Sequence, residues 1–110
     1  MSQTLQHQII SGVLAIFADE NNWTRGALAR NRNGDTCNWD DPNAVRYCAL
    51  GALIRVATDL VSNYDQARFI VIQVTRHVLA ASNRSGSVLP HINDVEGHAA
   101  IVAMFKKALV

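Results

Sequence analysis

Apolar side chains recur at the spacing of an α-helix in four stretches of the chain. The four predicted helices begin near Leu5, Pro42, Tyr64 and Asn93. The first three end near Ala18, Ser62 and Ala81, where polar residues interrupt the pattern. Asp41 suits the residue before the second helix, and Pro42 suits its first position. Asn93 and Glu96 have the spacing of a capping box, which predicts the start of the last helix.

All four predicted helices carry an apolar stripe that would face a common core. In the first helix the stripe consists of Leu5, Ile9, Val13, Ile16 and Phe17. In the second helix the stripe consists of Val45, Cys48, Ala49, Ala52, Leu53, Val56 and Leu60. In the third it consists of Ile70, Val74, His77, Val78 and Ala81, and in the last of Ile101, Met104, Phe105 and Ala108. Small residues at positions 49, 51 and 52 would let another element approach closely. The β-branched run at positions 69–72 also suits a strand, but the length of the pattern favours a helix.

Residues 22–42 are polar and rich in asparagine and arginine, and a structureless loop of this length is unusual in a compact domain. The dipeptide Asn33-Gly34 favours a two-residue type I′ turn. Such a turn predicts a hairpin of strands Leu28–Arg32 and Asp35–Trp39. In this register Arg30 would lie opposite Cys37, and Leu28 would lie opposite Trp39.

Length and composition place the chain among small globular domains. It has 110 residues, of which 49% are apolar and 17% are charged, and its formal net charge is +1. This balance excludes a strongly basic nucleic-acid coat and an acidic mimic of DNA, so direct binding to nucleic acid is not expected. The sequence predicts a mainly α fold. It would be one compact four-helix domain over residues 1–110, with a short β-hairpin inserted between helices 1 and 2.

The cellular setting is indicated by the cysteines and by the absence of targeting patterns. Cys37 and Cys48 are too few for a disulfide framework, so both are expected to be reduced. The first seven residues lack the cationic start of a secretory signal. The apolar stretch at positions 9–18 is too short to cross a bilayer. We therefore expect a cytoplasmic protein that does not contact a membrane.

Several residues occur in an order that resembles a known family. They are Trp23, the pair Ala29-Arg30, Gly34, the run Cys48-x-x-Gly51-Ala52-Leu53, and the pair Asn93-Asp94. From about Trp23 to the C-terminus, the chain is similar to a family of small bacterial and phage proteins catalogued as a domain of unknown function. The resemblance implies a fold and a setting between phage and host bacterium, and it implies no chemistry.

Two tryptophans and three arginines gather in the segment around the predicted hairpin. They are Trp23, Arg25, Arg30, Arg32 and Trp39. Guanidinium groups donate paired hydrogen bonds to anions, and indole rings offer flat faces for stacking. The set would therefore suit a partner protein or a small anionic ligand. In the alternative interpretation the tryptophans anchor the hairpin to the helices, and the arginines pair with aspartates at positions 35, 40 and 41.

Other combinations of side chains give weaker indications. Cys37 opposite Arg30 would favour a thiolate, but no motif of Cys/His enzymes surrounds it. His91, Asp94 and His98 have a spacing that could hold zinc, but Asp94 also suits a helix N-terminus. We therefore assign no catalytic residue, no metal and no cofactor.

The sequence favours a non-enzymatic phage or bacterial accessory protein that acts by binding another protein. One version inhibits a host defence complex, as anti-CRISPR proteins do, by docking on a bacterial defence effector rather than by mimicking DNA. Another version is a homodimer that presents a ligand pocket, with an interface formed by spare apolar helix faces such as Ile10 and Leu14 of the first helix. The alternative function is a nucleotide or small anionic ligand-binding module, or a small enzyme, that uses the Trp/Arg hairpin.

Overall fold

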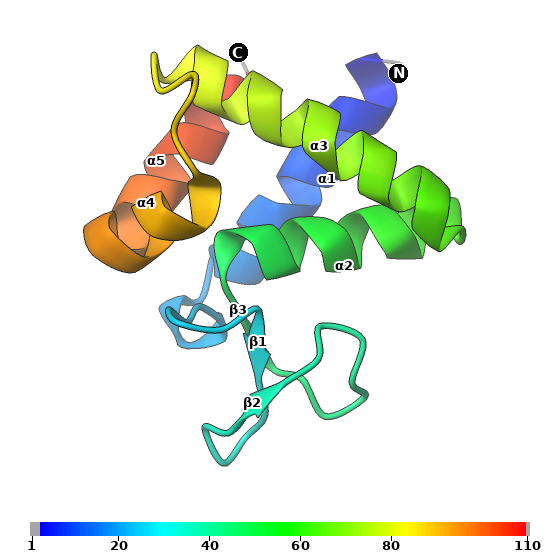
Figure 1. The fold of residues 1–110 in the computed structure, drawn as a ribbon, viewed down its shortest axis with the longest axis vertical. Helices are drawn as coiled ribbons and strands as arrows, with labels where there is room; N and C mark the ends of the chain where they lie inside the picture. The colour runs from blue at the N-terminus through cyan, green and yellow to red at the C-terminus, as the bar shows by residue number, and fades with distance from the viewer. Residues whose placement is uncertain (1–2, 110) are drawn as a thin grey trace.

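The structure is a computed structural model that describes residues 3–109 (Figure 1). The helices are α1 (Gln3–Phe17), α2 (Ala49–Val61), α3 (Tyr64–Ala81), α4 (Leu89–Glu96) and α5 (His98–Ala108). The strands are β1 (Ala29–Arg30), β2 (Thr36–Cys37) and β3 (Arg46–Tyr47), and a short 3-10 helix, η1, covers Glu20–Asn22. The mainly helical class is confirmed. The described chain has five helices, however, rather than the four predicted.

The helices enclose one apolar core, and the small sheet lies at one end of the molecule (Figure 1). The predicted stripe of α5 is buried, and so are Ile70, Val74 and Val78 of the stripe in α3. His77 and Ala81, which complete the predicted stripe of α3, are half-buried. Ile10 is also buried and Leu14 packs against the core, so the expected dimer surface on α1 is wrong. Among residues 3–109, no helix has both the length and the apolar character needed to cross a membrane.

Two glycines lie where neighbouring elements leave no room for a side chain. A Cβ atom at Gly12 would lie 2.7 Å from Cγ1 of Val56, at the crossing of α1 and α2. A Cβ atom at Gly51 would lie 2.0 Å from the carbonyl oxygen of Leu28. The prediction that small residues let another element approach α2 is therefore confirmed. The approaching element is the backbone just before β1.

The second helix begins later than predicted. Asp41 does not cap it, because its Oδ1 accepts a hydrogen bond from the backbone N of Asn43 (2.8 Å) within a turn. The residues just before α2 are extended instead, and β3 pairs with β1. Cys48 is the residue that caps α2, where its Sγ accepts from Gly51 N (3.4 Å). Pairing with β1 gives the backbone of this segment hydrogen-bond partners. Tyr47 of this strand is buried.

The predicted last helix is divided in two at Gly97, whose φ is +92°. α4 begins at Leu89, so Asn93 lies inside this helix and does not begin one. Glu96 forms an ion pair with Arg84 rather than returning to the backbone of Asn93. The capping-box assignment is therefore wrong. Its spacing recurs inside helices as well, because residues three apart share a helix face.

The hairpin lies where the sequence predicts it, but its register differs. The sheet order is β2-β1-β3 with antiparallel pairs, and Ala29 lies opposite Cys37. The turn explains the shift. Gly34 N donates to Asn31 O and Asn31 N donates to Asp35 O, both at 3.0 Å, and Gly34 has φ +85°. This three-residue loop with a glycine bulge replaces the predicted type I′ turn and moves the pairing by one residue.

Candidate functional site

A buried asparagine joins the sheet end to the helices. Asn93 in α4 has no exposed surface. Its Oδ1 accepts hydrogen bonds from Trp23 Nε1 (2.8 Å) and from Ala49 N (3.0 Å). Its Nδ2 donates to Thr24 O and to Asp94 Oδ1, both at 3.0 Å. All four hydrogen-bonding positions of the amide are occupied, so one side chain caps α2 from outside and holds the loop before β1.

The next residue extends this junction to the protein surface. Asp94 Oδ1 also accepts a hydrogen bond from Gly26 N (3.0 Å). That N–H group, followed by the Asn93 amide, lowers the pKa of the Asp94 carboxyl below its usual value, and nearby Arg25 acts in the same direction. Gly26 has φ +76°, a conformation that glycine adopts readily. The ionised carboxylate therefore fixes the loop that follows Trp23.

The indole of Trp23 is half-buried and packs against α5. The ring of His98 meets it edge-on, with ring centroids 6.1 Å apart. His98 is itself held by a hydrogen bond between its Nε2 and Phe17 O (2.7 Å). The guanidinium of Arg25 lies over the Trp23 ring at 5.1 Å. Trp23 thus anchors the loop to the helices, and Arg25 is the exposed member of this group.

The guanidinium of Arg30 is used inside the loop. Its Nε donates to Thr24 Oγ1 (2.9 Å), and its Nη1 donates to Gly34 O (3.0 Å). Its Nη2 donates to Arg25 O (3.1 Å). These bonds connect the tip of the hairpin to the segment after Trp23. Arg30 therefore holds the loop in one conformation and does not present its charge to a ligand.

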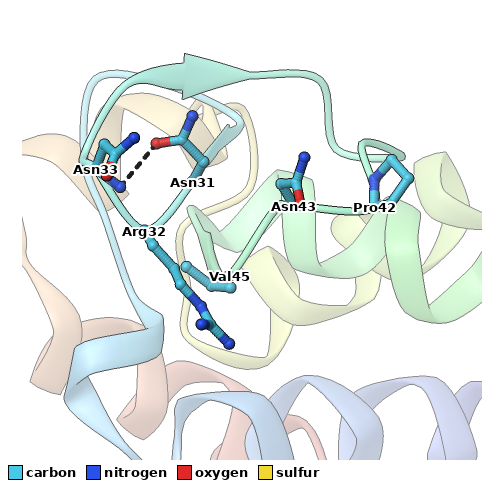
Figure 2. A pocket seen from close by; sticks show the side chains of 6 residues that line it. All are labelled: Asn31, Arg32, Asn33, Pro42, Asn43 and Val45. Carbon is cyan, nitrogen blue, oxygen red and sulfur yellow. Dashed lines mark hydrogen bonds between the residues drawn. The ribbon is translucent and has the colours of Figure 1, made fainter.

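Arg32 stands at the hairpin tip, beside a polar pocket with a volume of about 510 Å³ (Figure 2). The pocket is lined by Asn31, Arg32, Asn33, Pro42, Asn43 and Val45. Figure 2 shows the Arg32 side chain extending past Val45, between the hairpin turn and the segment that leads to β3. Within residues 3–109, the side chains of Arg32, Asn33 and Asn43 have no hydrogen-bonding or ionic partner. Their N–H groups are the donors that a carboxylate or phosphate accepts.

Trp39 lies apart from the other predicted residues. Its ring stacks on that of Tyr64 at the start of α3, with centroids 5.9 Å apart and planes inclined by 4°. The guanidinium of Arg68 lies over Tyr64 at 5.9 Å. A cavity of about 450 Å³ beside the two rings is lined by Asn38, Trp39, Asp40, Thr58 and Tyr64. Trp39 does not pair with Leu28, whose carbonyl accepts from Cys48 N.

The predicted cluster therefore separates into three parts. Trp23, Arg25 and Arg30 meet at the junction with α4, Arg32 lines the pocket, and Trp39 contacts α3. The alternative interpretation is right for Trp23, which anchors the loop. It is wrong for the arginines, because the ion pairs in the described residues are Arg55–Asp59 and Arg84–Glu96.

The sequence interpretation missed the central role of Asn93 and the contacts of His98 and Tyr64. One indication was present for Asn93. It follows Leu89 and Ile92, which are both buried, at helical spacing. A polar residue on the inward face of a helix requires internal partners. The partners come from segments far away in the sequence, so their identity could not be inferred.

The surroundings of both cysteines raise the pKa of their thiols. Cys37 lies opposite Ala29, and Arg30 lies opposite Thr36, so the expected contact between thiol and guanidinium is absent. Burial, followed by the charge of Asp41, raises the pKa of Cys37. Burial also raises the pKa of Cys48, and both residues are free thiols. The expectation of a thiolate favoured by Arg30 is therefore wrong.

The three residues considered as zinc ligands do not converge on one site. His98 contacts Phe17 O, and Asp94 accepts from Gly26 N. His91 is exposed on α4. Over residues 3–109, no three His, Cys, Asp or Glu side chains are placed to hold a metal ion together.

A family of unknown function, DUF6197, matches residues 1–109. The chain belongs to this family. No curated protein and no solved structure matches the chain. The match includes α1, so the similarity extends beyond the segment from Trp23 onward that carried the resemblance in the sequence.

The residues that carried this resemblance hold the sheet to the helices. Trp23 and Asn93 hydrogen-bond to each other, and Arg30 closes the hairpin on the loop. Cys48 caps α2, and Gly51 gives the backbone before β1 room to pass. In the DUF6197 chain these residues thus have structural roles in the fold.

Proposed function

We propose that the protein is a non-enzymatic binding protein whose hairpin docks on a partner protein. The docking surface, here called the hairpin surface, consists of Arg25, Arg32, Asn33 and Asn43. The observation that supports it most strongly is the contrast between neighbouring arginines. Arg30 is fully engaged in fixing the loop, whereas Arg32 has no partner within the described residues.

A loop that is fixed before binding loses little conformational freedom when the partner arrives. Arginine and aromatic side chains also contribute more than most residues to protein interfaces. The net charge of +1 supports a mixed protein interface rather than a nucleic-acid surface. These properties favour docking on a protein by shape and by a few directed hydrogen bonds.

The partner class to test first is a bacterial defence complex. The sequence resembles phage-borne proteins, and an inhibitor of the anti-CRISPR type would meet such a complex in the cytoplasm. Two free thiols fit a reducing compartment of this kind. The balanced charge fits docking on the effector and does not fit mimicry of DNA.

The test is capture of a partner from a lysate of the source organism with the purified, tagged protein. Wild-type protein should retain one protein complex in stoichiometric amount. The double variant Arg25→Glu/Arg32→Glu should lose it, because both arginines of the hairpin surface are reversed in charge. Lys106→Glu/Lys107→Glu is the matched control, since it makes the same charge change on the exposed end of α5. Equal capture by both double variants would refute the role of the hairpin.

A small anionic ligand is the second candidate, and the pocket beside Arg32 is the observation that favours it. Its polar lining and unpartnered N–H groups suit a phosphate or carboxylate. Isothermal titration with inorganic phosphate and with AMP should then give saturable heats that disappear in Arg32→Gln. Arg55→Gln, which removes an arginine of α2 that does not line the pocket, should leave them unchanged. If neither inorganic phosphate nor AMP binds to the wild-type protein, this second function is rejected.

A further inference from the structure

The outer face of α3 carries four exposed side chains in a single line. They are Asp65, Phe69, Ile72 and Arg76. Steps of four, three and four residues keep all four on one face of a helix. Phe69 is 64% exposed and Ile72 is 50% exposed, although both are large and apolar. Figure 1 shows α3 along the edge of the molecule opposite the sheet, so this stripe is separate from the hairpin surface.

If a second copy of this stripe is laid against it in the opposite direction, each residue faces a residue of complementary character. The two central residues are apolar, an acid stands at one end, and a base stands the same number of residues from the centre at the other. We propose that α3 forms an antiparallel contact with α3 of a second copy of this chain. In that arrangement Phe69 packs against Ile72 of the second copy, and Asp65 faces Arg76 of the second copy. The inference is independent of the proposed function.

Both charges of the stripe, Asp65 and Arg76, are without an ion-pair partner in the part of the chain that the structure describes. They stand about 16 Å apart along α3, at a rise of 1.5 Å per residue, so they cannot reach each other. Arg68, the nearest base to Asp65 on the helix, lies over the ring of Tyr64 instead. A twofold axis through the centre of the stripe would satisfy both charges twice.

A groove beside the stripe provides a place for an apolar side chain. It has a volume of about 420 Å³ and lies between α3 and the loop before α4. Ile72 and Val88 line it, and Val88 is 62% exposed. The Phe69 ring of a second copy would cover Ile72 and enter this groove, which removes three exposed apolar side chains from water in each chain.

The arrangement of charges distinguishes this contact from other ways of pairing two helices. A parallel contact would place Asp65 against Asp65 and Arg76 against Arg76, and like charges oppose association. Only the antiparallel twofold contact makes both ends attractive. Because the stripe is short compared with a standard interface, we expect a weak dimer that dissociates on dilution.

Sedimentation velocity over a range of micromolar to millimolar concentrations tests the dimer. The wild-type chain should shift from monomer to dimer as its concentration rises. Phe69→Asp should remain a monomer throughout, whereas Val95→Asp should dimerise like the wild type. Val95 is a matched control, because it is an apolar residue of α4 that is 65% exposed. Circular dichroism shows whether each variant remains helical.

A charge exchange tests the orientation. Asp65→Arg alone and Arg76→Asp alone should each raise the dissociation constant by at least about tenfold, because each creates like-charge pairs. The double variant Asp65→Arg/Arg76→Asp should return it to within about threefold of the wild-type value. A chain that is monomeric at every concentration overturns the proposal. So does a dimer that survives Phe69→Asp, or a double variant that is no better than the single ones.

Discussion

Replacing Gly51 by alanine tests the packing of the sheet on α2. The new Cβ atom would lie 2.0 Å from Leu28 O and 2.9 Å from Leu28 C. Both are backbone atoms, so no side-chain rotation relieves the clash. The segment before β1 must move away from α2 by more than an ångström. The hydrogen bond from Cys48 N to Leu28 O, which is 3.2 Å long, would then be lost.

The sizes of three effects give the expected change in the free energy of unfolding. Overpacking a tight contact costs about 1–3 kcal/mol, and the upper half of this range applies when the obstacle is backbone. Loss of the hydrogen bond costs about 1 kcal/mol. Alanine in place of glycine in a helix returns about 1 kcal/mol. We expect a net loss of about 2–3 kcal/mol, which lowers the melting temperature by roughly 10–20 °C for a domain of this size.

Urea unfolding followed by circular dichroism at 222 nm measures this loss. Gly12→Ala is the matched comparison, because its Cβ atom would meet side-chain rather than backbone atoms, at 2.7 Å and 3.3 Å from the two methyl groups of Val56. Because a side chain can shift more easily than the backbone, we expect that variant to lose less free energy of unfolding than Gly51→Ala. If Gly51→Ala were as stable as the wild type, with an unchanged dependence on urea, the backbone would not pass as closely as the structure shows.

Three further expectations concern the junction and the thiols. Asn93→Leu should lower the free energy of unfolding by about 3 kcal/mol or more, because it leaves several buried polar groups unpaired. Urea unfolding followed by the combined fluorescence of Trp23 and Trp39 measures this loss. The pKa of Asp94 is lowered in the folded state, so its contribution is present above its ordinary value of 3.8 and is lost as the pH falls below that. The free energy of unfolding, measured between pH 3 and pH 7, should therefore change less with pH in Asp94→Asn than in the wild type. An equal change with pH in both proteins would contradict this. Because the pKa of Cys37 is raised, its labelling by a thiol reagent at pH 7 should be slower than that of free cysteine, and Cys48 should react slower still; rapid labelling of either would oppose the thiol assignments.

The sequence predicted α1 and α3 well, because their bounds depend on residues within and next to each helix. α3 covers the stretch from Tyr64 to Ala81 that the apolar spacing indicates, and Asn63 caps it through a hydrogen bond from Gln66 N (2.9 Å). α1 is likewise confirmed, within two residues at its start. In both helices the apolar pattern and its length agree with the observed element, so local signals suffice to define it.

The candidate site was predicted only in part. Arg25 and Arg32 are exposed, whereas the guanidinium of Arg30 donates its hydrogen bonds to groups within the loop. The three arginines occur in one polar segment with no difference in local pattern. What separates them is which carbonyl oxygens the folded hairpin brings within reach, and this depends on a turn whose type was misjudged.

The amino-acid sequence by itself determined the helical class, the bounds of α3 and the presence of a hairpin. These follow from spacing and from residues that act on their immediate neighbours. Tertiary structure decided that the residues before α2 form a strand, that Gly97 divides the last helix, and that Asn93 caps a helix other than its own. Each of these outcomes depends on hydrogen bonds between segments that are far apart in the chain. Such bonds are favourable only once the core has brought the segments together.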